Sequence, residues 1–128
     1  MAMAQALNET GRPVFLSAAK GDLSGLSQIG WNVSNSYRTS TKVIDDPWQN
    51  VRASFLLNNN HATGTRPGWL NDPDLLAVGL KQLTPNEERT QFALWAISKD
   101  PLLISADLTQ ISSNSLAILK NKALIAVN

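Results

Sequence analysis

The chain has 128 residues, 43% of them hydrophobic, and a formal net charge of +1. These values suit one domain with a packed core, and they argue against bulk disorder and against a nucleic-acid or anionic-membrane surface. The sequence has no cysteine and one histidine, which excludes disulfides, thiolate metal sites and multi-histidine zinc sites. No glycine-rich phosphate loop follows any predicted strand, so a nucleotide site is not expected. On these grounds together we expect neither a metal nor a cofactor.

The first third of the chain is predicted to contain a helix end and two strands. Residues 1–10 suit the last turns of a helix, because Gly11 can cap it and Pro13 cannot continue it. A chain that opens this way suggests a missing upstream segment. The apolar run at residues 14–19 predicts a buried strand, and the Gly- and Ser-rich residues 20–30 predict a loop. Residues 31–41 are polar for a core strand, which is typical of a strand that lines a site or an edge.

A helix is predicted to begin at Asp46, whose side chain can cap it, with Pro47 at its first position. Trp48 and Phe55 recur at helical spacing and are expected to pack into the core, and the helix should end at residues 58–60. His61 follows in a polar loop, where we expect a solvated surface residue.

Residues 66–79 form the most informative stretch, with Asn-Asp-Pro-Asp at residues 71–74. Pro73 lacks a backbone donor and favours extended geometry at Asp72. One interpretation is a short strand with Asp72 and Asp74 on the same face, where two carboxylates repel unless a function uses them. The other is a turn in which both side chains bond nearby amides.

The last part of the chain predicts two helices around a strand. Thr84 begins a capping box with Pro at the first helical position, and the helix should run to about Lys99. Its buried stripe is expected to comprise Phe92, Trp95 and Ala96. Residues 102–105 predict a buried strand with Asp107 at its carboxyl end. A last helix, capped by Ser112 or Ser113, should pack Leu116 and Leu119 inward, and apolar residues 123–127 follow.

The alternation of strands and helices predicts parallel strands joined by right-handed crossovers. Polar residues gather where strands end, namely Arg38, Asp72 with Asp74, and Asp107, which is where parallel α/β folds place their sites. Four strands cannot close an eight-stranded barrel, which takes about 250 residues.

Four segments then carry a resemblance that covers nearly the whole chain. They are Ala-Leu-Asn-Glu-Thr-Gly-Arg-Pro at 6–13, Asn-Asp-Pro-Asp-Leu-Leu at 71–76, Phe-Ala-Leu-Trp-Ala-Ile at 92–97 and Pro-Leu-Leu-Ile-Ser-Ala-Asp-Leu at 101–108. With them the chain resembles the carboxyl-terminal half of the catalytic barrel of glycoside hydrolase family 27, the α-galactosidases and α-N-acetylgalactosaminidases. The resemblance implies an α/β fold, a partial (β/α)8 TIM barrel of roughly strands five to eight, with residues 1–128 as a single partial-barrel domain.

The resemblance also implies where the chemistry should lie. Members are retaining enzymes that need a carboxylate nucleophile and a carboxylic acid/base. The family nucleophile lies on strand four, upstream of Met1. The acid/base shortly follows the strand-six Arg, which Arg38 matches, and its position holds Lys42, or Val43 when the alignment runs backward from the next Trp. The nearest carboxylates, Asp45 and Asp46, are the candidate acid/base residues.

Sugar binding transfers better than catalysis. The resemblance implies that Arg38, Asp74 and Leu75 bind substrate. On strand five it places Ala19 where the family has a sugar-binding Glu. Lys20 stands for the usual Trp, and Ala18 for a disulfide-bonded Cys.

The implied function is retaining hydrolysis of terminal α-D-galactosyl residues, with an α-galactoside carbohydrate as partner and with neither nucleic acid nor membrane. The alternatives are a non-catalytic carbohydrate-binding paralogue and a partial gene product without function of its own. The N-terminus does not resemble a signal peptide, and the compartment stays open, as do the oligomeric state, the aglycone, and galactose versus N-acetylgalactosamine.

Overall fold

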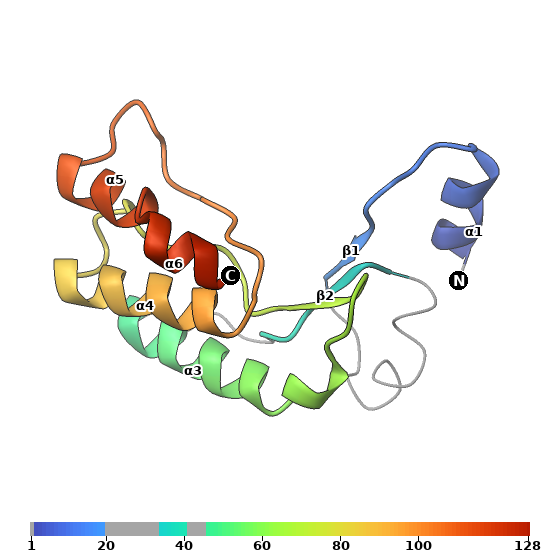
Figure 1. Ribbon diagram of the computed structural model, residues 1–128, viewed down its shortest axis with the longest axis horizontal. Coiled ribbons are helices and arrows are strands. Elements are labelled where there is room, and N and C mark those ends of the chain that lie inside the picture. The colour runs from blue at the N-terminus through green and yellow to red at the C-terminus, as the bar shows by residue number, and fades with distance from the viewer. Residues whose placement is uncertain (1, 20–33, 41–45) are drawn as a thin grey trace.

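A computed structural model describes residues 2–19, 34–40 and 46–128. The elements, in order, are α1 (Ala2–Glu9), β1 (Ser17–Ala18), β2 (Ser36–Arg38), α3 (Pro47–Asn59), a 3-10 turn (Ala62–Gly64), β3 (Leu70–Asp72), α4 (Pro85–Ile97), α5 (Ser113–Leu119) and α6 (Lys122–Val127). Helices α3 to α6 gather on one side of the short strands, and α1 lies at the far end beyond β1 (Figure 1). The predicted loop at residues 20–30 lies outside the described residues.

The strands form a parallel sheet in the order β1-β2-β3. Beyond β3 the chain makes one further parallel bridge, between Leu76 and Ile104. This bridge is held by the Leu76 amide, which donates to the Leu103 carbonyl at 2.8 Å, and by the Ser105 hydroxyl, which donates to the Leu76 carbonyl at 2.6 Å. The predicted parallel α/β arrangement is therefore confirmed within the described residues.

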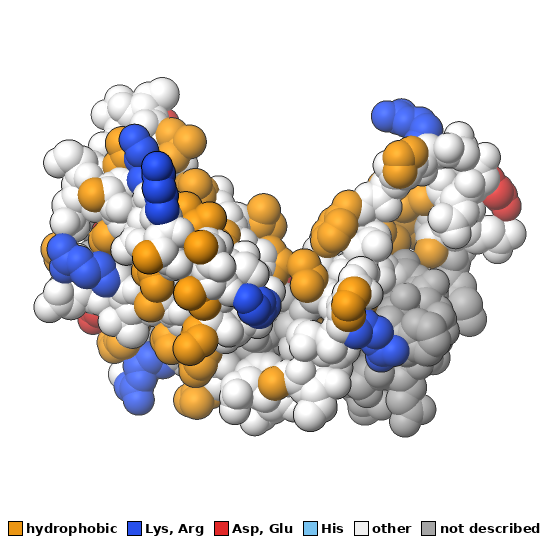
Figure 2. All heavy atoms as spheres, in the orientation of Figure 1, with side chains coloured by type: hydrophobic (Ala, Val, Ile, Leu, Met, Phe, Trp, Pro, Cys, Tyr) orange, Lys and Arg blue, Asp and Glu red, His pale blue; other side chains and the backbone are white. Residues whose placement is uncertain are grey.

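Two predicted strands are shorter and less buried than expected. Of residues 14–19 only Ser17–Ala18 form a strand, and the Phe15 side chain is 64% exposed. Residues 102–105 contribute the single bridge, with Leu103 and Ile104 exposed. Both predictions of burial were wrong, because no described element covers these side chains. Figure 2 shows hydrophobic side chains on both arms of the molecule and in the hollow between them.

The helix boundaries follow the predicted caps. Asp46 Oδ1 accepts a hydrogen bond from the Gln49 amide at 3.0 Å, and Thr84 forms a capping box with Glu87. Ser112 caps α5 by accepting from the Ser115 amide. Residues 1–10 were predicted to end a helix, and α1 ends at Glu9 before Gly11, whose φ of 66° suits a left-handed cap.

One predicted feature of the last helices differs from the structure. Leu119 is buried as expected, but Leu116 is exposed, and Ile118 is buried in its place. The buried face of α5 also includes Ser115, so it is rotated away from the predicted one. The apolar residues 123–127 lie in the helix α6.

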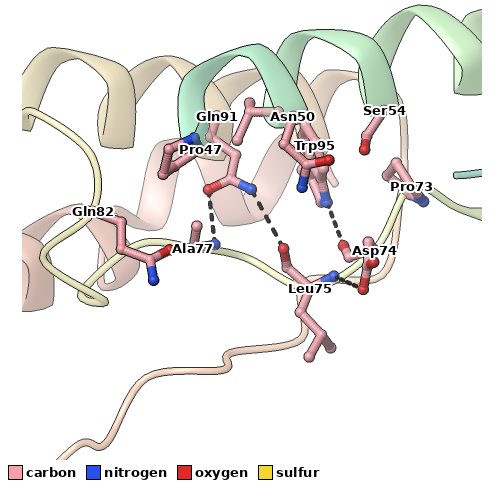
Figure 3. Close-up of a pocket in the computed structure, with 11 residues that line it drawn as sticks. Pro47, Asn50, Ser54, Pro73, Asp74, Leu75, Ala77, Gln82, Gln91 and Trp95 are labelled. Carbon is pink, nitrogen blue, oxygen red and sulfur yellow. Dashed lines mark hydrogen bonds between the residues drawn. The ribbon is translucent and has the colours of Figure 1, made fainter. Parts of the chain in front are cut away.

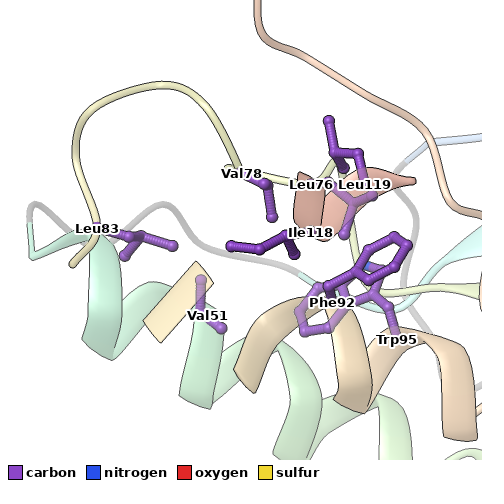
Figure 4. Close-up of a cluster of buried hydrophobic side chains, with 8 residues drawn as sticks. All are labelled: Val51, Leu76, Val78, Leu83, Phe92, Trp95, Ile118 and Leu119. Carbon is purple, nitrogen blue, oxygen red and sulfur yellow. The ribbon is translucent and has the colours of Figure 1, made fainter. Parts of the chain in front are cut away.

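The core lies between the segment after β3 and helices α3, α4 and α5 (Figure 4). Its buried members are Val51, Leu76, Val78, Leu83, Phe92, Trp95, Ile118 and Leu119. Trp48 and Phe55 pack against it while partly exposed, so their prediction is confirmed. Burial of each large side chain contributes about 1.5–3 kcal/mol to stability. This core therefore holds the segment that follows β3 against helices α3, α4 and α5.

Among the described residues, no helix is long and apolar enough to cross a membrane. Nor do three or more His, Asp or Glu side chains of that part of the chain come together as a metal-binding group.

Candidate functional site

The candidate site lies where β2 and β3 end. Arg38 closes β2 and pairs in register with Asp72, which closes β3. Arg38 Nη2 lies 2.7 Å from Asp74 Oδ1, and about one third of each side chain is exposed. A partly exposed ion pair of this kind contributes at most about 1 kcal/mol to folding. The structure thus brings together two predicted substrate-binding residues at the carboxyl edge of a parallel sheet.

Asp74 reaches Arg38 because the backbone turns sharply after β3. Its φ is 96°, an uncommon conformation for a residue other than glycine. Asp72 Oδ1 accepts a hydrogen bond from the Asp74 amide at 2.9 Å, and Asp74 Oδ1 accepts one from the Leu75 amide at 2.8 Å. The strand interpretation is confirmed up to Asp72, where β3 ends, and it is wrong for Asp74, whose backbone is not extended. The turn interpretation is confirmed, because each carboxylate stabilises a local amide.

Side chains of helix α4 hold the backbone of the same turn. Trp95 Nε1 donates to the Asp74 carbonyl at 2.9 Å. Gln91 donates to the Leu75 carbonyl at 3.4 Å and accepts from the Ala77 amide at 2.9 Å. In Figure 3 these bonds tie the turn to α4 beside a cavity of about 70 Å³, and the Leu75 side chain points away from the helices. With their carbonyls held by α4, Asp74 and Leu75 keep a fixed backbone orientation.

A buried hydrogen-bond chain supports the other end of the turn. The Asp72 carbonyl accepts from the Thr39 amide at 2.8 Å and lies 3.2 Å from the Thr39 hydroxyl. Thr39 Oγ1 lies 2.9 Å from Asn58 Oδ1, and Asn58 Nδ2 donates to Asp100 Oδ1 and Oδ2 at 2.9 and 3.0 Å. Burial raises the pKa of Asp100 from 3.8 to about 7, against the lowering effect of the Asn58 hydrogen bond, and the Asp72 charge adds to the rise.

Three buried polar atoms of the described residues have no hydrogen-bond partner. They are Arg38 Nε, Trp69 Nε1 and Asn71 Oδ1. Nearly all such atoms in folded proteins are paired, so each marks a place where a further group is expected. Arg38 Nε belongs to the same guanidinium that bonds Asp74, which leaves this arginine with a donor to spare.

One of the two acid/base candidates, Asp46, lies among the described residues. Asp46 is exposed, and its carboxylate caps α3 through the Gln49 amide. The other candidate, Asp45, lies outside the described residues, as do Lys42 and Val43 at the family position. Ala19, for which the resemblance implies a sugar-binding Glu in the family, is exposed after β1, and Lys20 is also outside the described residues.

Several residues around the turn were missed by sequence reasoning. Trp95 was assigned to the core alone, and Thr39, Asn58 and Gln91 were given no role. A signal was available on α3, where Ser54 and Asn58 lie on the same buried face as Val51. His61 was expected at a solvated surface, but it is only partly exposed, and its carbonyl accepts from Asn71 Nδ2 at 2.9 Å.

Comparison with known proteins places this geometry in a family. The profile of the Melibiase_2 family, described as Alpha galactosidase A, matches residues 1–128. The chain is 40% identical over 126 residues to Alpha-galactosidase 3 of Arabidopsis thaliana, and this covers 98% of the chain and 29% of that protein. It is 34% identical to the Probable alpha-galactosidase of Dictyostelium discoideum, of which it covers 32%.

Solved structures give the same result. The α-galactosidase of Saccharomyces cerevisiae with raffinose superposes with a TM-score of 0.87 at 28% identity, over 98% of this chain and 32% of that one. A β-L-arabinopyranosidase of family 27 from Geobacillus stearothermophilus, at 22% identity and a TM-score of 0.88, shares the fold. The chain spans about a third of the length of these proteins, and its fold is part of a (β/α)8 barrel. The chain belongs to the α-galactosidase family, glycoside hydrolase family 27.

Proposed function

We propose that this chain forms the sugar-holding wall of an α-galactosidase site, with Arg38 and Asp74 bonding the hydroxyls of a terminal α-galactosyl residue. The observation that carries the proposal is the 2.7 Å contact between the two side chains at the carboxyl edge of the sheet. A carboxylate accepts hydrogen bonds from sugar hydroxyls, while a guanidinium donates them to sugar oxygens. The pair therefore offers one acceptor and one donor to neighbouring hydroxyl groups of the sugar. Leu75, 43% exposed beside them, would contact the apolar face of the ring.

Within the barrel, the described strands would correspond to strands five to eight, and residues 1–128 to one partial-barrel domain. Coverage of only 29–32% of the relatives named above supports a partial barrel, and the strand numbers come from the family resemblance. The structure of the yeast enzyme contains raffinose, which fits the proposed substrate class of α-galactosides.

The share of this chain in catalysis would be binding and orientation. A retaining glycosidase needs two carboxyl groups about 5–5.5 Å apart. The family acid/base position holds Lys42 or Val43, and neither side chain can act as a carboxylic acid. Asp46 is engaged at the start of α3, which leaves Asp45 as the remaining candidate for a substitute acid.

The second candidate function is that of a non-catalytic carbohydrate binder. The use of the Asp46 carboxylate as a helix cap favours it, because the site then keeps a sugar-holding pair without that acid. Both candidates predict galactose binding, and they differ in turnover.

The test uses the full-length protein as its source cells produce it, which we call the native product. D-galactose titration of Asp74→Asn is compared with Glu9→Gln, which makes the same acid-to-amide change at an exposed site on α1. Loss of a charged hydrogen bond predicts about 10- to 100-fold weaker binding for Asp74→Asn. Equal affinity in both variants would remove the proposed sugar contact. Hydrolysis of an aryl α-galactoside then separates the candidates: turnover supports the hydrolase, and binding without turnover supports the binder.

A further inference from the structure

The Asp72 carbonyl belongs to the turn that presents Asp74, and its hydrogen-bond donors come from Thr39. Thr39 carries one amide proton and one hydroxyl proton. The amide donates at 2.8 Å, but the hydroxyl oxygen lies near two acceptors, the Asp72 carbonyl at 3.2 Å and Asn58 Oδ1 at 2.9 Å. One proton cannot fully serve both acceptors. The choice between them is therefore set by what Asn58 does.

Asn58 is oriented by Asp100, 42 positions away in sequence. Its Nδ2 donates to both carboxylate oxygens of Asp100, which forces its Oδ1 toward the Thr39 hydroxyl. All three side chains are at least 96% buried, so no bulk water substitutes for a missing partner. The amide of Asn58 thus transmits the state of Asp100 to Thr39.

We propose that Asp100 is a positioning residue for the sugar-holding turn, acting through Asn58 and Thr39 on the Asp72 carbonyl. With Asp100 ionised, the Thr39 hydroxyl donates to Asn58, and the Asp72 carbonyl keeps the Thr39 amide alone. With Asp100 protonated, its new O–H can donate to Asn58 Oδ1 once that amide turns over. Asn58 Nδ2 then donates to Thr39 Oγ1, and the Thr39 proton moves to the Asp72 carbonyl. The expected effect on sugar binding rests on the proposed function, whereas the rearrangement of hydrogen bonds between Asp100 and the Asp72 carbonyl does not.

The surroundings of Asp100 allow this change near neutral pH. Burial raises its pKa to about 7, and among the described residues Asp72 is the charged group that acts on it. The adjacent Lys99 ammonium bonds the carbonyl of Val127. Asn128 Nδ2 donates to the backbone carbonyl of Asp100 at 2.9 Å, which leaves the carboxylate to Asn58.

The first measurement needs no sugar. Trp95 Nε1–H donates to the Asp74 carbonyl, so its indole NMR signal reports the position of the turn. In the native product we expect this signal to shift between pH 5 and 9 with a midpoint near 7. The shift should vanish in Asp100→Asn and shrink in Thr39→Val, which replaces the hydroxyl by a methyl group. Thr39→Ser, which keeps it, should restore the shift.

The matched control is Glu88→Gln, another buried carboxylate changed to an amide. Glu88 bonds the Gly79 amide at 2.8 Å and the Ser115 hydroxyl at 2.7 Å, outside the chain of bonds to Asp72. The Glu88→Gln substitution should lower the stability of the protein and leave the pH-dependent shift of the Trp95 indole signal unchanged. A flat signal in the native product, or an unchanged shift in a folded Thr39→Val, would overturn the proposal.

D-galactose affinity over the same pH range is the second measurement. One hydrogen bond gained or lost at the turn predicts a change of about two- to twelvefold across the midpoint, absent in Asp100→Asn. An indole shift without galactose binding would refute the proposed function and leave the positioning role standing. Galactose binding with neither a pH step nor an indole shift would refute the positioning role and leave the proposed function standing.

Discussion

Replacing Asp100 by Asn should make the protein more stable above neutral pH. The folded state raises the pKa of this carboxyl from 3.8 to about 7, so between these values the folded chain holds a proton that the unfolded chain has lost. Stability therefore falls as pH rises through this window. The contribution of the protonated group is complete below pH 3.8 and is lost above pH 7. The amide that Asp100→Asn introduces stays neutral at every pH, and its oxygen can still accept from Asn58.

The size of the effect follows from the size of the shift. One pKa unit is about 1.4 kcal/mol, so three units set a ceiling of about 4 kcal/mol. Relaxation of the buried surroundings, including the neighbouring Asn58 amide, stabilises the ionised carboxylate and lowers this ceiling. We therefore expect about 2 kcal/mol at pH 8. An effect of this size is a large part of the stability of a typical domain.

Urea unfolding of the native product from pH 5 to 9 measures this effect. The wild type should lose stability with rising pH, while Asp100→Asn should show a flatter profile. The control is Asp107→Asn, because hydrogen bonds from Thr109 lower the pKa of that exposed carboxyl and confine its effect to acid pH. Equal slopes in the wild type and Asp100→Asn would show that Asp100 does not titrate in this range.

Three further predictions concern stability. Gly79→Ala should cost about 2–3 kcal/mol in urea unfolding, because its φ is 89° and a Cβ would lie 2.8 Å from Ile111, whereas Gly68→Ala, at φ 85° with open space around it, should cost about 1 kcal/mol. Glu88→Ala leaves the buried Gly79 amide unpaired and leaves the Ser115 hydroxyl with Ser112 Oγ alone, and it should cost about 1–3 kcal/mol by thermal unfolding. Asp46→Ala should cost about 1 kcal/mol as a lost helix cap and leave turnover unchanged, while a 10²- to 10⁴-fold loss of hydrolysis would make Asp46 an acid/base residue instead.

The features that the sequence predicts well are those whose partners lie within a few residues. The caps at Asp46 and Thr84 are completed by amides three positions later, so a short window contains the whole interaction. The turn at Asp72 and Asp74 is equally local, but two local outcomes compete there. Sequence reasoning left both open because Pro73 is compatible with a strand end and with a turn.

Burial is predicted poorly where it depends on what lies opposite. An apolar run such as residues 102–105 indicates a buried strand only if another element covers it, and composition says nothing about that element. Phe15 and Leu103 are exposed for this reason. In α5, the burial of Ile118 where Leu116 was predicted to be buried has another cause. Several apolar residues lie close together in one short helix, so periodicity does not fix the helix phase.

The pair at the site shows a third situation. Arg38 and Asp74 are 36 positions apart. The strand pattern predicted both at strand ends, the family resemblance gave them a common role, and parallel pairing of β2 with β3 brings them together. Asn58 could have been identified without any resemblance. A polar residue on the buried face of a helix is costly unless it has a partner, and its place with Ser54 and Val51 on α3 was visible in the spacing. What the spacing could not supply was the partner, Asp100, because that contact forms only when α3 and the end of α4 pack together. A buried polar position on a predicted helix therefore predicts a hydrogen-bond network before its members are known, and here that network leads to the turn that holds Asp74.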